Sequence, residues 1–106
     1  MLRIDQLRLL PDQPESDLTA KCARLLRTDP SSLRDLTVLR RAIDAREGLT
    51  FVYTVAVSAP QEAALLRRCR DKRVTAYVPE HYALPAPVAP PEVRPIVVGA
   101  GPAGLF

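Results

Sequence analysis

The sequence describes a small, mildly basic chain of ordinary globular composition. Its 106 residues suffice for one small domain, and 47% hydrophobic with 25% charged residues exclude wholesale disorder. The net charge is +3 with acidic residues spread among the basic ones, which argues against a dedicated nucleic-acid surface. No apolar run has transmembrane length, and Met1 to Leu10 alternates charged and apolar residues, unlike a signal peptide, so we expect a cytoplasmic protein.

The first part of the chain predicts a strand followed by a helix. Residues 2–9 alternate apolar and polar side chains, and the alternation slips near Asp5 and Gln6 in the way that a β-bulge produces. A helix is predicted from an N-cap at Ser16 to Arg27, because apolar residues recur at helical spacing between them. An Asp-Pro-Ser-Ser turn then separates this helix from the next element.

A β-hairpin is predicted next, with strands at residues 35–45 and 49–58 and with Gly48 in the left-handed position of a three-residue loop. That loop sets a register that pairs Ala45 with Leu49, Ile43 with Phe51, Arg41 with Tyr53 and Leu39 with Val55. This face is mostly apolar and includes both aromatic rings. The opposite, open face carries Arg40, Ala42, Asp44, Thr50, Val52 and Thr54.

The remaining elements complete a β-α-β-β-α-β order. A second helix is predicted to begin at Pro60 and to end in a basic run, and a short strand covers residues 74–78. This order predicts an α+β, ferredoxin-like sandwich with an antiparallel sheet in the order 4-1-3-2 and both helices on one face. Cys22 and Cys69 fall on the helix faces assigned to the core, where they act as small hydrophobic residues rather than redox thiols.

The composition changes after the sandwich, which is predicted to span residues 1–84. Five prolines fall within residues 85–95, a density that favours a semi-rigid, extended linker. Residues 96–106 then hold an apolar, β-branched strand followed by glycines. The chain therefore predicts one folded domain, a linker and the first residues of a second domain.

The glycines near the end of the chain have the G-x-G-x-x-G spacing of a dinucleotide-binding loop. In this interpretation Gly99 permits a tight turn, Gly101 lets the backbone approach a pyrophosphate, and Gly104 allows a helix that opens inside the motif to pack closely on the strand. The predicted cofactor-binding residues are Gly99, Ala100, Gly101, Pro102, Ala103 and Gly104. The acidic residue that binds a ribose in such sites would follow Phe106, so we expect residues 99–104 to bind no ligand and to lack regular structure here.

Two segments of the chain resemble a family of flavoproteins. Residues 97–106 resemble the FAD-binding opening of bacterial FAD-dependent dehydrogenases, also described as NAD(P)/FAD-dependent oxidoreductases. Residues 38–46 are similar to the Arg-Arg-x-x-Asp-Ala-Arg segment of that family's N-terminal extension, and the proline-rich approach to the glycines is similar too. The resemblance implies FAD bound through Gly99, Gly101 and Gly104 in the full-length protein, with NAD(P)H as a candidate electron donor.

Three charged residues on the open face of the hairpin, Arg40, Asp44 and Arg46, form a second candidate site. They alternate along the face, so they could contact a neighbouring domain or an anionic ligand. The third interpretation is a solvated edge strand whose charges discourage edge-to-edge aggregation. Exposed charge on an edge strand is the commonest of the three cases, followed by domain docking and then by ligand binding.

Together these patterns predict a non-catalytic accessory domain that packs near the flavin domain of the same chain, within an FAD-dependent oxidoreductase. No catalytic or metal site is expected within these residues, since the single histidine, His81, lies in a loop away from any nucleophile motif. The alternative is a ferredoxin-like binding module for a small regulatory ligand or RNA. RNA binding by stacking needs exposed aromatic rings, which the predicted register places under the helices. The oligomeric state stays open.

Overall fold

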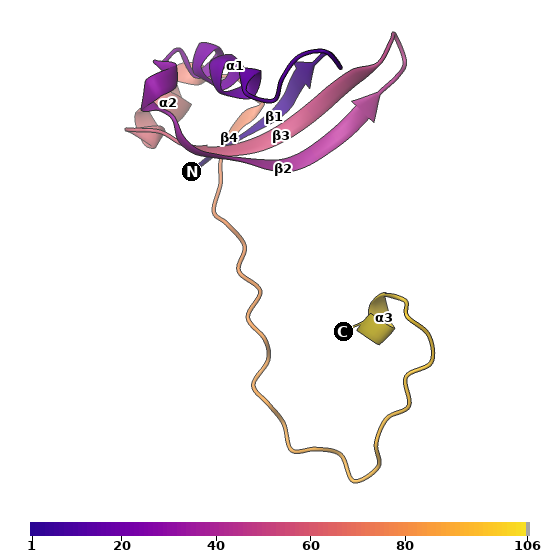
Figure 1. The fold of residues 1–106 in the computed structure, drawn as a ribbon. Helices are drawn as coiled ribbons and strands as arrows, with labels where there is room; N and C mark the ends of the chain where they lie inside the picture. The colour runs from indigo at the N-terminus through magenta and orange to yellow at the C-terminus, as the bar shows by residue number, and fades with distance from the viewer. Residues whose placement is uncertain (106) are drawn as a thin grey trace.

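A computed structural model describes residues 1–105 and consists of an α+β sandwich followed by a long tail (Figure 1). The elements in chain order are β1 (Leu2–Leu9), α1 (Asp17–Leu26), the 3-10 turn η1 (Pro30–Ser32), β2 (Arg34–Asp44), β3 (Thr50–Ser58), α2 (Glu62–Cys69), β4 (Val74–Ala76) and α3 (Pro102–Leu105). The four strands form one antiparallel sheet in the order β2-β3-β1-β4, with α1 and α2 on one face. This is the predicted order 4-1-3-2 counted from the opposite edge, so the fold class is confirmed.

The central strand β1 supplies much of the core. Leu2, Ile4, Leu7 and Leu9 are all at most 5% exposed. The register slips between Ile4 and Leu7, where Gln6 adopts a φ of 61°, so the predicted bulge is confirmed. The bulge keeps all four apolar side chains on one face, because a strand without it would turn Leu7 and Leu9 to the other side.

The helices cover three strands of the sheet and leave the fourth uncovered. The core consists of Leu2, Ile4, Leu7, Leu9, Leu18, Cys22, Leu26, Tyr53, Val55, Val57, Leu65 and Val74. These residues come from β1, α1, β3, α2 and β4. None of the 11 residues of β2 is buried. Only Leu36 of β2 packs against this core, so the strand is held mainly by its pairing with β3.

The hairpin register is confirmed near the loop and differs further along. The confirmed pairs are Arg41 with Tyr53 and Ile43 with Phe51. The predicted pair of Leu39 with Val55 is wrong, since Val38 takes the place opposite Val55. Leu39 is the extra residue of a second bulge, between Val38 and Arg40. Gly48 has a positive φ of 105°, as the predicted loop requires.

The predicted N-cap position of the first helix is confirmed, whereas the second helix begins later than predicted. Ser16 occupies the N-cap position of α1, but its hydroxyl makes no cap hydrogen bond. Backbone carbonyls of the preceding turn accept from the first N–H groups of this helix instead. The helix α2 begins at Glu62 rather than at Pro60, because Gln61 adopts a left-handed φ of 55° and interrupts the turn.

The tail starts where the pairing of β4 ends. The strand β4 stops at Ala76, before the predicted Val78, because its partner β1 begins at Leu2. A hydrogen bond of 2.9 Å from the Tyr77 N–H to the Met1 carbonyl closes the sheet. The proline-rich residues 85–95 lie in the extended segment that follows (Figure 1).

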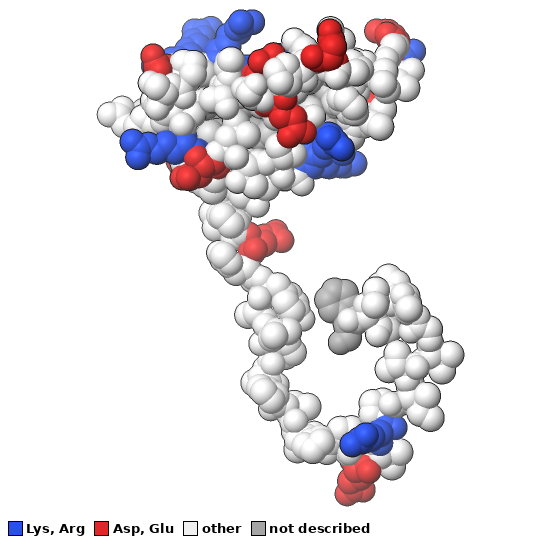
Figure 2. Space-filling model, in the orientation of Figure 1, with Lys and Arg blue, Asp and Glu red and all other residues white. Residues whose placement is uncertain are grey.

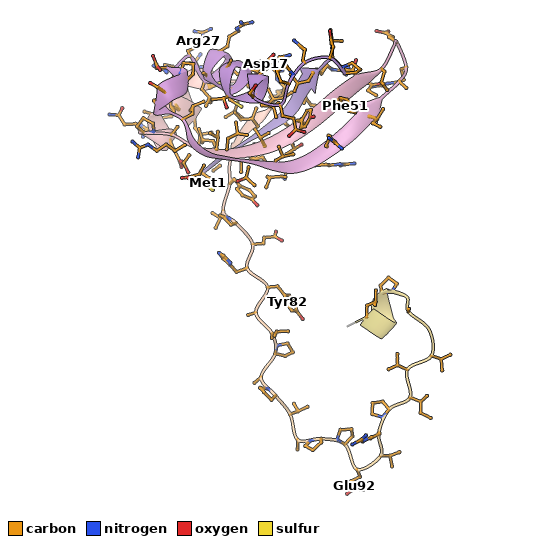
Figure 3. All side chains as sticks on the ribbon, in the orientation of Figure 1. Met1, Asp17, Arg27, Phe51, Tyr82 and Glu92 are labelled. Atoms are coloured by element: carbon orange, nitrogen blue, oxygen red, sulfur yellow. The ribbon has the colours of Figure 1, made fainter. Side chains whose placement is uncertain are left out.

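Figure 2 shows charged side chains interspersed over the sandwich and nearly absent from the tail. Tyr82, 81% exposed, projects from the extended segment (Figure 3). Between residues 1 and 105, no helix combines the length and the apolarity that a membrane span needs. Phe106, the last residue of the segment predicted to start a nucleotide-binding domain, lies outside the described residues.

Replacing Ile4 with Ala tests the core assignment. Ile4 is 0% exposed, so Ile4→Ala is expected to lower the free energy of unfolding by about 2–5 kcal/mol through lost burial and a residual cavity. The matched control is Ile96→Ala in the tail, where the side chain is 89% exposed and a change below about 0.5 kcal/mol is expected. Urea denaturation followed by circular dichroism measures both, and equal effects would contradict this core.

Candidate functional site

A shallow groove crosses the open face of the sheet near the hairpin loop. Arg8 of β1, Val52 of β3 and Ala42 of β2 are register partners and form a row across three neighbouring strands. A cavity of about 450 Å³ is lined by Gln6, Arg8, Arg40, Ala42, Ile43, Asp44, Ala45, Arg46, Val52 and Thr54. The groove thus combines small apolar side chains with arginines from two strands and the adjoining loop.

Asp44 organises the arginines at the loop end of this groove. The Arg46 side chain donates from Nε to Oδ1 at 2.9 Å and from Nη2 to Oδ2 at 2.8 Å. Nη2 of Arg8 lies 3.1 Å from the same Oδ2. Hydrogen bonds from the side chain and backbone N–H of Arg46, with help from Arg8, hold the pKa of the Asp44 carboxyl well below its ordinary value. The Asp44 carboxylate therefore stays charged and keeps two guanidinium groups in place.

The structure brings the three sequence-predicted residues of this face together. Asp44 and Arg46 form the ion pair described above, and Arg40 lies on the same face opposite Thr54. Arg46 is largely exposed, its side chain retaining 82% of its accessible surface. Among residues 1–105, no carboxylate forms an ion pair with Arg40.

Sequence reasoning missed Arg8 and Gln6 as parts of the groove. Simple alternation from Leu2 turns Arg8 toward the core, and only the bulge at Gln6 turns it to the open face. The slip in alternation was the available signal, since a slip reverses the face of every later residue of the strand. Counting the bulge would have placed Arg8 beside Asp44.

The aromatic rings of the hairpin lie on the helix-covered face, as predicted. Tyr53 is 2% exposed, and its hydroxyl donates to Oε1 of Glu15 at 3.0 Å. The Arg41 guanidinium lies 5.5 Å from the centroid of the Phe51 ring, and its Nη1 lies 3.5 Å from the same Glu15 oxygen. The hairpin consequently offers no aromatic ring to a ligand on the open face.

Pro102–Leu105 form a helical turn whereas residues 99–101 form bends, so the expectation that residues 99–104 lack regular structure is wrong for residues 102–104 only. The Gly101 carbonyl accepts hydrogen bonds from the N–H groups of Gly104 at 2.9 Å and Leu105 at 3.1 Å, which closes the first turn of α3. Pro102 stands at the first position of this turn, where a missing N–H costs nothing and φ is preset for a helix. These contacts are local and need no surrounding sheet.

Each glycine of the loop meets a different steric requirement. Gly99 has a φ of 99°, a conformation that favours glycine. A Cβ at Gly104 would lie 2.2 Å from the Gly99 carbonyl oxygen and 3.3 Å from Cγ1 of Val97, so the close approach of the helical turn to the preceding backbone excludes a side chain there. A Cβ at Gly101 would meet no atom within 4 Å, which leaves open space beside the backbone.

The remaining candidate residues do not gather into a site. Burial raises the pKa of the Cys22 thiol to about 11, which keeps it protonated, and the half-buried Cys69 thiol donates to the Leu25 carbonyl at 3.4 Å. His81 lies exposed on the extended segment. Within the described part of the chain, no three metal-ligating side chains form a group.

Comparison with known proteins places the sandwich in a family. The model of a family described as "Domain of unknown function (DUF8436)" matches residues 1–58, which is more than half of the chain. The chain belongs to the DUF8436 family. A relative from Clostridium beijerinckii, described as an uncharacterized protein, is 30% identical to this DUF8436 chain over 108 residues. That alignment covers 99% of this chain and 20% of the relative, so the chain spans about a fifth of the relative's length.

The two matches cover different parts of this DUF8436 chain. The family match ends at Ser58, the last residue of β3, so it includes the β2-β3 hairpin and the four charged groove residues. The glycine loop lies outside the residues that the family model matches. The alignment with the Clostridium beijerinckii relative covers 99% of the chain and so extends into this loop.

The pH dependence of stability tests the role of Asp44. Because folding lowers the pKa of this carboxyl from its ordinary 3.8, its contribution is present above that value and is lost as the pH falls below it. We expect the melting temperature to fall between about pH 5 and pH 2, and Asp44→Asn to flatten part of that decline. Asp12→Asn, at an exposed loop residue, is the control and should leave the profile unchanged. Identical profiles for wild type and Asp44→Asn would contradict the ion-pair geometry.

Proposed function

We propose that the sandwich is a non-catalytic accessory domain at the N-terminal end of an FAD-dependent oxidoreductase, and that residues 96–105 begin its dinucleotide-binding domain. In this proposal the sandwich packs near the flavin domain of the same chain and shapes substrate access or subunit contact. The geometry of the glycine loop is the observation that carries it. NAD(P)H is the proposed electron donor.

The three glycines fit the separate roles that a dinucleotide-binding loop requires. The positive φ of Gly99 suits a tight turn after the apolar residues 96–98, and the close contact of Gly104 with the Gly99 carbonyl and Val97 suits the close helix packing of such loops. The open space at Gly101 is where the backbone of such loops approaches a pyrophosphate. A glycine-rich tail without this function would have no reason to meet all three requirements at this spacing.

FAD, when bound, would supply the electron-accepting ring for the oxidation of a substrate. Residues of this chain would contribute only to holding its pyrophosphate. The turn at Gly99 directs the chain from the apolar residues 96–98 into α3, where the N–H groups of Gly104 and Leu105 bond to the Gly101 carbonyl and Pro102 has no N–H. Gly101 keeps the approach of the pyrophosphate free of side chains.

The length of the relative and the reach of the linker support an accessory role. About four fifths of the Clostridium beijerinckii relative lies outside the alignment, which leaves room for a complete flavin domain. Residues 78–91 lack regular structure and run extended to a bend at residues 92–93, and at about 3.1 Å per residue they could span roughly 43 Å. A linker of that reach would allow the sandwich to contact a flavin domain on any of its faces.

The second candidate function is a binding module for a small anionic regulatory ligand, which the arginine-lined groove favours. Arg8, Arg40 and Arg46 face one cavity that holds a single carboxylate, Asp44. Guanidinium groups held in fixed positions suit carboxylates and phosphates. RNA recognition by base stacking is less well supported, because Phe51 and Tyr53 lie on the helix-covered face.

Substitution of single glycines tests the FAD assignment in the full-length protein. Gly101→Ala is expected to weaken FAD binding about tenfold or more while leaving the melting temperature of the apoprotein unchanged, because the added methyl meets only open space until the pyrophosphate arrives. Gly104→Ala should lose FAD as well, through the clash with the Gly99 carbonyl. Ala89→Gly, an exposed linker residue outside the loop, is the control that keeps binding.

Flavin absorbance after gel filtration measures these affinities. Absence of flavin from the wild-type protein after incubation with saturating FAD would contradict the proposal. A reading frame that stops directly after Phe106 would contradict it too.

Deletion of residues 1–84 from the full-length protein tests the accessory role separately. The shortened protein is expected to keep FAD, since the glycine loop is intact, and to change its KM for substrate or its subunit assembly. Steady-state kinetics and light scattering measure both properties. Turnover and assembly identical to those of the wild type would show that the sandwich does not serve the flavin domain.

A further inference from the structure

The strand β2 is unusually exposed for a regular element of this length. None of its 11 residues is buried, and three of its apolar side chains are exposed, moderately for Val38 at 38% and Leu39 at 37% and strongly for Ile43 at 66%. The strand ends the sheet, so no strand among residues 1–105 pairs with its outer edge. An edge of this kind is a ready template for another strand.

The part of β2 that could accept a strand is short and regular. Register shifts lie between Arg34 and Thr37 and between Val38 and Arg40, and bulges there twist the edge and oppose pairing. Residues 40–44 pair with β3 without any shift. The regular stretch therefore runs from Arg40 to Asp44 and has Ala42 at its centre.

The charges of this stretch are complementary to those of a second copy. In an antiparallel pair related by a two-fold axis, residues equally distant from the axis lie opposite each other. An axis at Ala42 places Arg40 of each copy opposite Asp44 of the other. An axis at Arg40 or Arg41 would instead place an arginine opposite itself, which is destabilising. An axis at Ile43 would set Ala42 opposite Asp44, so only the axis at Ala42 sets Arg40 opposite a carboxylate.

The same register covers the most exposed apolar side chain of the strand. With the axis at Ala42, Ile43 of one copy lies opposite Arg41 of the other. The Arg41 guanidinium is held 5.5 Å from the centroid of the Phe51 ring, so its aliphatic stem is available to pack against Ile43. Ala42 faces its own copy across the axis, and its small side chain permits a close approach.

We propose that two copies of this chain pair through the outer edges of β2, antiparallel and centred on Ala42. The pairing extends each four-stranded sheet into one continuous sheet and forms two symmetric ion pairs between Arg40 and Asp44. Arg40 has no ion-pair partner within the described residues, whereas Asp44 is already bonded by the Arg46 side chain and N–H and approached by Arg8. Arg40 of the second copy would therefore take the place of the Arg46 side chain, which is 82% exposed. A second copy is favoured over an unrelated partner, because the charge pattern complements itself.

Light scattering coupled to gel filtration tests the dimer and its charge pairing. The wild-type chain is expected to elute with twice the mass of one chain over a dilution series. Arg40→Glu sets two carboxylates opposite each other at both symmetric positions, so the dissociation constant should rise about tenfold or more. Arg67→Glu on the exposed side of α2 makes the same change of charge and should leave the dimer intact. A monomeric wild type, or equal effects of both variants, would overturn the proposal.

Cysteine cross-linking tests the register. In a Cys69→Ser background, Ala42→Cys should form an interchain disulfide with an added oxidant, because directly opposed Cα atoms lie about 4.5–5.5 Å apart, within disulfide range. Thr75→Cys, on the opposite edge strand β4, is the matched control and should stay monomeric on a non-reducing gel. Cross-linking through position 75 and not 42 would assign the dimer to the other edge and overturn the proposal, as would cross-linking at neither position.

Discussion

The bulge at Gln6 is the constraint on which both faces of the sheet depend. It reverses the alternation of β1 at mid-strand, so Leu7 and Leu9 join the core that Leu2 and Ile4 begin. The same reversal turns Arg8 outward to Asp44. A regular strand would bury Arg8 and expose Leu7 and Leu9. The burial of the charge and the exposure of the leucines would each destabilise the fold by about several kcal/mol. The core and the groove thus have one structural origin.

The position of β2 outside the helical layer explains its composition. The core beneath α1 and α2 needs apolar side chains from the sheet. The strands β1, β3 and β4 supply them. The strand β2 is largely free of that demand, so the exposed Arg40 can occupy it, and Arg8 and Arg46 offset the partial burial of Asp44, whose side chain is 14% exposed. Its apolar residues need another explanation, because a strand held by pairing alone gains little from Val38 or Ile43 in water.

Topology was predictable here because order and amphipathicity leave few alternatives for two helices and four short strands. The register near Gly48 was predictable for a similar reason, since the loop conformation fixes the first pairs. The bulge at Leu39 was not, because Val38 and Leu39 are both apolar and alternation cannot tell which faces inward. The helical turn after Gly101 was not predicted for this chain. It is closed by hydrogen bonds to the Gly101 carbonyl, and the composition of the segment does not reveal them.

The glycine loop and the sandwich differ in how much neighbouring structure they need for stability. The glycine loop closes its turn with local hydrogen bonds, but the apolar residues 96–98 before it are exposed and gain stability only within a larger sheet. The sandwich is complete on its helical side and open on its charged face and outer edge. Because edge pairing through β2 leaves the open face uncovered, a second copy and a flavin domain could occupy these surfaces together. The extended linker places no steric limit on such an arrangement.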